Sequence, residues 1–434
     1  ISACLVGSEM CIRDSSNAPD YDEWMFAERE HWHRVLSQVL EQLARLQSER
    51  GDLSGSLETA RRWVIHDPLD EAAHRQLVRV LFATEGKAAA LQAYERCRLI
   101  LSERLITEPS PETMALADHL RNTNASHLVN RVKSPLLTRP YNLPFVGRAT
   151  EHRALVVAYH RMGEQPVQVI TLEGEAGIGK TRLANEFLAW AVAQGSDILH
   201  GQAYEAGGSL PYQPLVDALR ACLDQENAPE DLLNDVWLSE LARLLPELRD
   251  RYPDLPSAND DQFTRNRLFE TVATLGVALA KRKPIVFFVD DLQWADSASL
   301  DMLHYLIRRW RASRSPFLIL LSIRGETVPA LSEWLANLGR EATLDHIGLK
   351  PITIKDTHQL IGSVINEQQQ ERLAQWLFAE TKGQPFFLVE TINVLFEQGV
   401  LKPNAVGLIE LVGDIASVKA VIAPGVREVI LVRL

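Results

Sequence analysis

Residues 174–181 read GEAGIGKT and match the pattern G-x-x-x-x-G-K-[ST]. Residues 167–172, VQVITL, predict a buried strand before the motif, and an amphipathic segment over 182–192 predicts a helix after it, which is the strand–loop–helix context that the motif requires. Its glycines let backbone amides face a phosphate at the positive end of a helix dipole. Lys180 would supply a charge to the β- and γ-phosphates, and Thr181 a hydroxyl to Mg²⁺. We therefore predict that ATP or ADP with Mg²⁺ binds to Gly174, Glu175, Ala176, Gly177, Ile178, Gly179, Lys180 and Thr181.

A pair of aspartates follows a second apolar run, Pro284–Val289, which is typical of a central parallel strand covered on both faces. A carboxylate at the carboxyl end of such a strand faces the nucleotide, so we predict that Asp290 holds Mg²⁺. Asp291 is then placed to orient or deprotonate the attacking water. The alternative for Asp291 is a helix N-cap without a catalytic role, and we expect Asp296 to cap the helix that continues to Trp310.

Arg324 comes shortly after a third apolar run, Phe317–Leu321. An arginine at the carboxyl end of a strand can contact a γ-phosphate through bidentate hydrogen bonds, whereas the alternative is a solvated side chain. Ahead of the phosphate motif, residues 145–148 with Glu151 start a helix that we expect to cover adenine. The predicted catalytic residues are thus Asp290, Asp291 and Arg324, and the predicted nucleotide contacts extend to Val146 and Arg148.

The segment from residue 23 to about residue 121 is helical in its pattern, with apolar residues recurring at spacings of three and four. We predict helices near residues 57–64, 72–82 and 88–105, and a short last helix from Pro111. Gly51 and Gly86 are 35 residues apart, close to the tetratricopeptide period, and we expect each to open a helix pair. Such pairs stack into a small solenoid with a concave partner-binding surface, and a plain helical bundle is the alternative.

The amino-acid composition excludes several classes of protein. With 434 residues, 46% of them hydrophobic and 24% charged, the chain resembles an ordinary multidomain globular protein. The net charge of −12 offers no excess of positive charge to a nucleic-acid backbone. None of the four cysteines forms a CxxC pair, which argues against a zinc module, and no apolar run approaches the ~20 residues of a membrane span. We therefore expect a cytoplasmic protein.

Residues 21–121 resemble the bacterial transcriptional activator domain of antibiotic-regulatory-protein-like activators. In that family the domain follows a winged helix-turn-helix and mediates protein–protein contacts, including self-association. The resemblance therefore implies protein partners for the helical repeat, and DNA binding only through a winged-helix domain that is missing from this chain. The residues that carry it are Trp24, Glu28, Arg29, Gly51, Asp67, Pro68, Leu69, Glu71, His74, Arg75, Leu77, Gly86, Ala90, Leu91, Tyr94 and Pro109.

Residues 142–434 resemble the signal-transduction ATPases with numerous domains, of the AAA type, found in large LuxR-type and activator-domain regulators. The motifs FVGR, GEAGIGKT, VDDLQWAD, LLSIRGE and GQPFF appear in the order that this family shows. The resemblance implies a five-stranded parallel P-loop core with a helical lid, whose Gly-x-Pro motif contacts nucleotide through Pro385. Gln293 departs from the family, in which a histidine is common at this position.

The predicted organisation is an all-α tetratricopeptide-like repeat followed by an α/β P-loop NTPase with a parallel sheet and a helical lid. We place the helical domain at residues 21–121, a linker at 122–143, the ATPase core at 144–350, and the lid with the start of a winged-helix region at 351–434. Residues 1–20 contain a stretch, 4–15, that resembles a translated sequencing adapter; a natural N-terminus is the alternative. On this view the chain is a fragment, cut at both ends.

The function expected from these features is an ATP-binding regulator of transcription, in which a slow ATPase acts as a nucleotide switch for the helical domain. The first alternative is a binding module whose ATP or ADP is structural and is not turned over. A metabolic kinase of the P-loop type is the second, and it lacks a recognisable acceptor-substrate motif.

Overall fold

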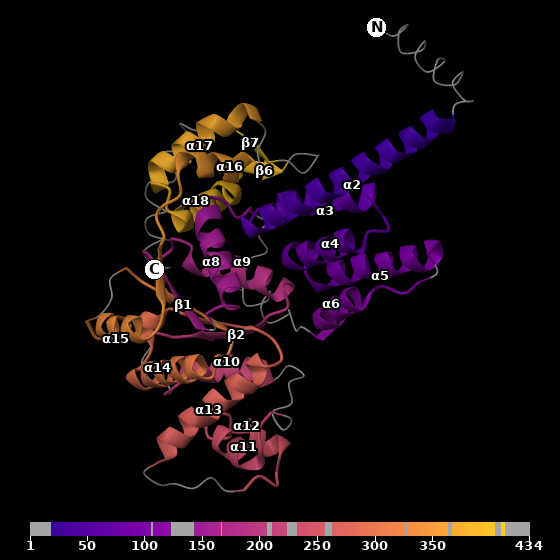
Figure 1. Cartoon of the computed structure of the whole chain (residues 1–434). Coiled ribbons are helices and arrows are strands. Elements are labelled where there is room, and N and C mark those ends of the chain that lie inside the picture. Colours follow the sequence, from indigo (N-terminus) through magenta and orange to yellow (C-terminus); the bar gives the residue numbers. More distant parts are fainter. Residues whose placement is uncertain are drawn as a thin grey trace.

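The computed structural model describes residues 19–105, 107–122, 143–165, 167–205, 211–223, 232–256, 263–325, 329–362, 367–403 and 409–412. Three parts follow one another along the chain: an N-terminal helical domain, an α/β core and a C-terminal helical subdomain (Figure 1). The adapter-like stretch 4–15 and the expected winged-helix start at 424–434 lie outside the described residues.

The N-terminal helical domain has five described helices: α2 (Pro19–Glu49), α3 (Leu53–His66), α4 (Glu71–Thr84), α5 (Lys87–Arg104) and α6 (Pro111–Asn122). These helices confirm the predicted ones. Asp52 and Asp70 begin α3 and α4 as N-caps, because their side chains accept backbone N–H bonds of 2.9 Å from Gly55 and 2.8 Å from Ala72.

The two glycines of the predicted repeat lie inside turns. Gly51 joins α2 to α3 with φ +76°, and Gly86 joins α4 to α5 with φ +94°. Glycine adopts this left-handed backbone without a steric penalty, which explains its use at both places. Each glycine also directly precedes two consecutive helices, α3 and α4 after Gly51 and α5 and α6 after Gly86, as predicted.

The core is a five-stranded sheet in which all paired neighbours are parallel, with strand order β2-β3-β4-β1-β5. Its strands are β1 (Val167–Glu173), β2 (Asp197–Gln202), β3 (Ile285–Asp290), β4 (Phe317–Ile323) and β5 (Leu344–Gly348). The three strands predicted individually, β1, β3 and β4, lie in the centre of the sheet. The parallel P-loop fold class is thereby confirmed.

Helices cover both faces of the sheet, as parallel strands require. Alternate residues of β3 point to opposite faces: Val286 and Phe288 join an apolar cluster with α8 (Ala149–Arg161) and α9 (Lys180–Ala193). Phe287 and Val289 join the cluster on the other face. That second face is covered by α10 (Gln213–Leu223), α11 (Asp235–Leu241), α12 (Glu247–Arg251), α13 (Thr264–Ala280), α14 (Ser297–Ala312) and α15 (Pro329–Glu341).

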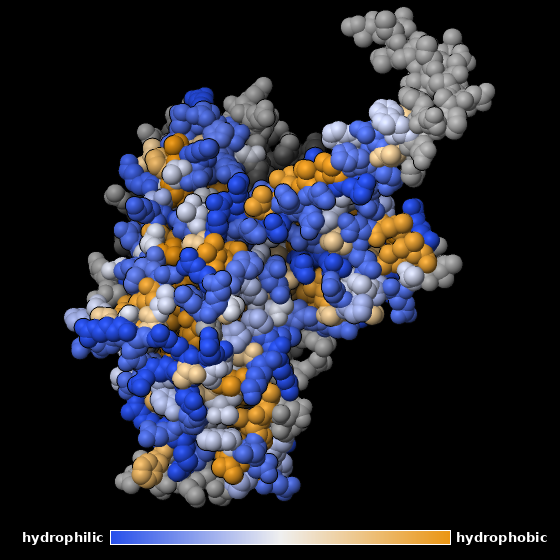
Figure 2. All heavy atoms as spheres, in the orientation of Figure 1, coloured by the Kyte–Doolittle hydropathy of each residue, from blue (hydrophilic) through white to orange (hydrophobic). Residues whose placement is uncertain are grey.

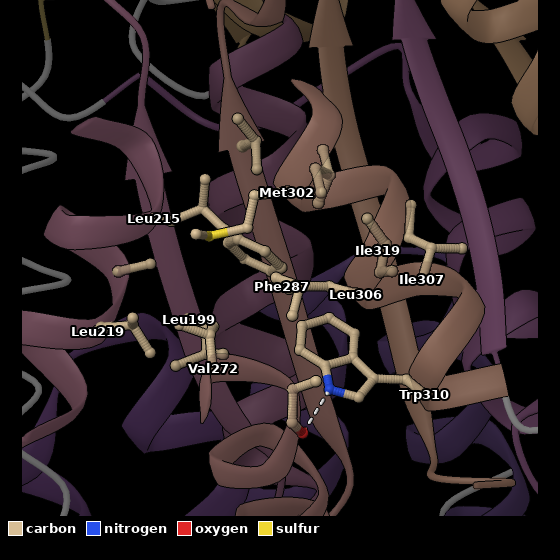
Figure 3. Close-up of a cluster of buried hydrophobic side chains, with 14 of the residues drawn as sticks. Leu199, Leu215, Leu219, Val272, Phe287, Met302, Leu306, Ile307, Trp310 and Ile319 are labelled. Carbon is tan, nitrogen blue, oxygen red and sulfur yellow. Dashed lines mark hydrogen bonds between the residues drawn. The ribbon is translucent and has the colours of Figure 1, made fainter. Parts of the chain in front are cut away.

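Trp310 anchors the second face (Figure 3). Its indole stacks on Phe317 with ring centroids 3.9 Å apart, and its Nε1 donates a 3.1 Å hydrogen bond to the carbonyl of Ala273. The neighbouring Arg309 forms an ion pair with Glu270 at 2.6 Å. Trp310 therefore packs, and Arg309 forms an ion pair, near the end of α14.

The C-terminal helical subdomain contains α16 (Ile354–Gly362), α17 (Glu367–Thr381) and α18 (Pro385–Glu397). A two-stranded antiparallel pair, β6 (Leu401–Pro403) and β7 (Ile409–Leu411), follows these helices. The subdomain has its own apolar cluster, distinct from those of the sheet. Among the described residues, none of the helices combines the length and apolar character that crossing a membrane demands.

The N-terminal helical domain packs directly on the α/β core. Val192 and Ala193, at the end of α9, share one apolar cluster with Val78, Phe82 and other residues of the helical domain. Beside it, Nε2 of His119 donates a 3.1 Å hydrogen bond to the carbonyl of Val192. The two domains are thus joined through buried contacts as well as through the chain.

Candidate nucleotide-binding site

The phosphate loop, Gly174–Thr181, connects β1 to α9 at the carboxyl edge of the sheet. Gly177 and Gly179 have φ values of +74° and +99°, a conformation that glycine adopts without strain. A Cβ at Gly177 would lie 2.6 Å from Cβ of Phe386 in the C-terminal subdomain. The loop therefore needs glycine for its backbone and, at Gly177, also for its contact with the subdomain.

Lys180 lies in the first turn of α9 and is only 7% exposed. Its Nζ donates hydrogen bonds of 2.8 Å to Gly174 O and 3.0 Å to Glu175 O, so the side chain folds over the loop. Burial lowers the pKa of Lys180, while the charges of Asp291 and Asp290 act in the opposite direction. The structure thus brings the predicted lysine together with both predicted aspartates.

Asp290 ends β3 and is 4% exposed. Thr181 Oγ1 donates a 2.9 Å hydrogen bond to its Oδ2, and the hydroxyl of Ser322 donates to its Oδ1. Burial and the charge of Asp291 raise the pKa of Asp290, while the hydrogen bonds from Ser322 and Thr181 oppose that rise. A hydroxyl and a buried carboxylate side by side are oxygen donors of the kind that Mg²⁺ prefers, so these residues fit the predicted metal.

The described residues contain no group of three or more His, Cys, Asp or Glu side chains arranged to hold a metal ion. Mg²⁺ sites commonly use one or two protein oxygens together with substrate phosphates and waters. Thr181 and Asp290 are the two side chains of this chain that suit such a site.

Asp291 follows with a left-handed backbone, φ +55° and ψ +44°. It precedes the short 3₁₀ helix η2 (Leu292–Trp294), yet its side chain makes no capping hydrogen bond there. Instead, its Oδ1 accepts a 2.8 Å hydrogen bond from Nε2 of Gln293. Asp296 behaves as predicted, because its side chain accepts a 2.9 Å bond from the amide of Ser299 at the start of α14.

Arg324 follows β4, the strand that lies between β1 and β3. Its guanidinium lies over the ring of Trp294, 5.5 Å from the ring centroid, and its backbone N–H donates a 3.2 Å bond to Oε1 of Gln293. The side chain is half-buried, at the same sheet edge as Lys180 and the aspartates. The structure thereby brings together the residues predicted for catalysis.

Arg148 and Val146 contact the site indirectly. One guanidinium nitrogen of Arg148 donates a 2.9 Å bond to Ile178 O and the other a 3.3 Å bond to Glu151, and the residue is 5% exposed. Arg148 therefore stabilises the backbone of the phosphate loop through the carbonyl of Ile178. Val146 packs against the apolar cluster of the C-terminal subdomain.

The subdomain contacts the loop through the residues around Pro385, the first residue of α18. Gln384 Nε2 donates bonds of 3.2 Å to Glu175 Oε2 and of 3.2 Å to Ala176 O, and Phe386 N–H donates a 3.1 Å bond to Gly177 O. Sequence reasoning missed Gln384, and it missed Ser322 on β4. Ser322 lies two residues before Arg324, at the carboxyl end of β4. Its place at that strand end is the one signal in the sequence that could have indicated a role in the site.

Comparisons with known proteins agree with this arrangement. Residues 144–320 match the model of the AAA ATPase domain, and residues 15–121 match that of the bacterial transcriptional activator domain. A protein of Rhizobium meliloti (strain 1021), "Uncharacterized protein R02095", is 24% identical over 269 residues; the alignment covers 57% of this chain and 24% of that protein. The chain thus spans about a quarter of the length of this relative.

Solved structures with similarity include a DNA replication initiation factor, with 13% identity and a TM-score of 0.33 over 58% of this chain and 62% of that one. Domain III of the Thermotoga maritima replication initiation protein DnaA has 12% identity and a TM-score of 0.32 over 61% of this chain and 92% of that one. The family matches cover both the N-terminal helical domain and the sheet with its phosphate loop. A match to the bacterial transcriptional activator domain is thus followed along this chain by a match to the AAA ATPase domain.

Proposed function

We propose that this chain is an ATP-binding signal-transduction regulator of transcription, in which the nucleotide state of the ATPase domain controls the N-terminal helical domain. One observation carries the proposal: one end of α9 lies in the phosphate loop and the other end contacts the N-terminal helical domain. The helix begins with Lys180 in the phosphate loop and ends with Val192 and Ala193 in the cluster of the helical domain. Its 14 residues span about 21 Å, so one rigid element joins the two places.

A second connection runs through α8. Arg148, just before this helix, holds the phosphate loop at Ile178 O. One turn later, the fully buried His152 donates a 3.2 Å hydrogen bond from Nδ1 to the carbonyl of Glu49 in α2. Displacement of the loop would therefore be transmitted to the helical domain through two helices.

The site residues suit ATP and its hydrolysis. The loop amides and Lys180 would hold the phosphates, and Thr181 and Asp290 would hold Mg²⁺, which when bound neutralises phosphate charge. Asp291 would accept the proton of the attacking water as its oxygen bonds to the γ-phosphorus and the bond to the β–γ bridging oxygen breaks. Arg324 would contact the γ-phosphate and so give ATP and ADP different affinities for the two conformations. We expect slow turnover, because a switch needs residence time in each state.

The partners of this switch would be proteins that bind the tetratricopeptide-like helices, including a second copy of the chain. The outer face of α2 exposes apolar side chains at alternating spacings of four and three (Figure 2): Trp32, Leu36, Val39, Leu43 and Leu46. A hollow of about 470 Å³ lies at the start of this row, lined by Trp24, Trp32 and His66 among others. Exposed apolar faces of this kind are typical of protein-interaction sites, and this spacing suits a helical partner.

The test compares hydrogen exchange in α4 and α6 with ADP and with a slowly hydrolysed ATP analogue. We expect the two nucleotides to give different exchange in the wild-type chain and identical exchange in Lys180→Ala, which should bind neither. Arg182→Ala removes a positive charge from the exposed side of the same helix and serves as the control.

Two results would contradict the switch. If Lys180→Ala bound ATP normally, the assignment of the phosphate loop would be wrong. The second result has three parts: the wild type binds both nucleotides tightly, it shows identical hydrogen exchange with each, and it hydrolyses ATP in a single turnover no faster than Asp291→Asn. The nucleotide would then be structural, as in the alternative interpretation.

A further inference from the structure

Gln293 links the two strand ends that carry the proposed catalytic groups. Its Nε2 donates a 2.8 Å hydrogen bond to Asp291 Oδ1, and its Oε1 accepts a 3.2 Å bond from the backbone N–H of Arg324. The orientation of the amide is unambiguous, because a backbone N–H can only donate and an ionised carboxylate can only accept. One side chain thus joins the end of β3 to the end of β4.

The carboxylate of Asp291 depends on this bond for its direction. The backbone of Asp291 is left-handed and is held by its N–H, which donates 2.8 Å to Ser322 Oγ and 3.1 Å to Asp290 Oδ1. Those bonds hold the main chain but leave the side-chain torsion open. Within the described part of the chain, the hydrogen bond that its carboxylate accepts comes from Gln293.

Arg324 is held from two sides by the same short helix. Gln293 accepts its backbone N–H, and the ring of Trp294 lies under its guanidinium at 5.5 Å. The negative face of an indole ring attracts a cation, which favours this position of the guanidinium. Gln293 and Trp294 of η2 therefore position both the proposed base and the proposed γ-phosphate contact.

We propose that Gln293 is a positioning residue for ATP hydrolysis, which holds Asp291 and Arg324 at a constant separation and, being an amide, does so independently of pH. This inference rests on the proposed function of the site. A histidine at residue 293 would reproduce the bridge only when neutral, with one nitrogen donating and the other accepting. A protonated histidine has two donors and cannot accept from Arg324 N–H.

The experiment uses the full chain with Gln293→Leu and Gln293→His. For Gln293→Leu we expect single-turnover hydrolysis to fall about 10- to 100-fold, because the base loses its orientation. The preference of Gln293→Leu for ATP over ADP should fall several-fold, while its ADP affinity stays within about twofold of wild type. Both affinities are measured with fluorescent nucleotides in Mg²⁺ and again in EDTA.

For Gln293→His we expect near-wild-type hydrolysis above about pH 7.5 and a loss below about pH 6.5, with an inflection that the wild type lacks. All rates are measured below the melting temperature of every variant, so a destabilised variant still yields a pH profile. Wild-type hydrolysis and an unchanged ATP-to-ADP ratio in Gln293→Leu would overturn the proposal, as would a Gln293→His profile without a new inflection.

Asp291→Asn, measured in parallel, separates this inference from the proposed function. If hydrolysis were slow in Asp291→Asn but normal in Gln293→Leu, only the positioning role of Gln293 would be overturned. Normal hydrolysis in Asp291→Asn would show that Asp291 is not the base and would overturn the positioning role of Gln293, whereas the switch would fail only if the wild type also gave identical hydrogen exchange with both nucleotides.

Discussion

The hydroxyl of Thr181 lies 2.9 Å from the carboxylate of Asp290, although 109 residues separate them in the sequence. They meet because β1 and β3 flank β4 and all three strands end at the same edge of the sheet. Ser322, on the strand between them, donates to the other oxygen of Asp290. The predicted magnesium site is therefore built by three adjacent parallel strands, and the topology of the sheet is what assembles it.

Asp290→Asn should stabilise the chain at neutral pH in the absence of nucleotide and Mg²⁺. Burial raises the pKa of Asp290, so its ionised form is unfavourable in the folded protein and costs stability as pH rises through the interval between the unfolded and folded pKa values. We expect a melting temperature about 2–4 °C above wild type at pH 7.5, with a gain that shrinks in acid.

The same substitution should abolish the stabilisation that Mg²⁺ and ATP give to the wild type. Asp345→Asn, at a partly exposed position on β5, is the control that should change neither quantity. A melting curve of Asp290→Asn below that of wild type at pH 7.5 would show that the buried charge is stabilised by its surroundings, contrary to the prediction.

Gly177→Ala should damage the chain more than Gly179→Ala. Both glycines have positive φ, so each alanine carries a similar backbone penalty of about 1 kcal/mol. A Cβ at Gly177 would also meet Phe386 at 2.6 Å, whereas a Cβ at Gly179 meets nothing within 4 Å. Urea unfolding should show a free energy of unfolding lower by a further ~1–3 kcal/mol for Gly177→Ala. Equal losses would mean that the loop and the C-terminal subdomain separate without cost.

Acid should loosen the junction between the two domains. Burial lowers the pKa of His152, and burial together with the charge of Lys283 lowers that of His119. A histidine with a lowered folded pKa is stabilising above its unfolded value, about 6.5, and that stability is lost as pH falls below it. Thermal unfolding should therefore show a falling melting temperature between pH 7.5 and pH 5.5.

His119→Gln tests which group is responsible, since glutamine can still donate to Val192 O but cannot become charged beside Lys283, whose Nζ lies 2.9 Å from His119 Nδ1. This variant should lose about 2–4 °C less than wild type on acidification. His358→Gln, at a partly exposed histidine of the C-terminal subdomain that contacts Glu371, is the control for a histidine away from the junction. An unchanged pH dependence in His119→Gln would assign the effect to other groups.

Val192→Asp should uncouple the two domains while sparing nucleotide binding. Val192 is 2% exposed, and a buried, unpaired carboxylate there costs on the order of 3 kcal/mol or more in the contact with the N-terminal helical domain. We expect nucleotide-dependent hydrogen exchange in α4 to disappear, with ATP affinity within about threefold of wild type, since Lys180 lies at the other end of α9.

Val192→Ala removes apolar contact without adding charge and should lose only about 1 kcal/mol of stability. Its nucleotide-dependent exchange should therefore persist. Persistence in Val192→Asp as well would exclude α9 as the connection between the domains.

Local patterns were sufficient for several elements. The glycines of the phosphate loop, the apolar runs of β3 and β4, the largely apolar segment of β1, and the caps at Asp52, Asp70 and Asp296 each produce their structure from neighbouring residues. The edge strands β2 and β5 were not predicted individually, because their partly exposed sequences DILHGQ and LDHIG lack a continuous apolar run. Their pairing with β3 and β1 is what makes them strands.

The sequence by itself determined which residue types were present for phosphate and Mg²⁺, and on which kinds of element they lie, since such signals extend over a few residues. Only the tertiary structure decided how those residues meet. Gln384 reaches Ala176 across 208 residues, and Gln293 reaches the Arg324 amide across 31. The end of α9 likewise joins the cluster of the N-terminal helical domain. Contacts between distant segments depend on strand order and domain packing, and no local pattern of residues encodes them.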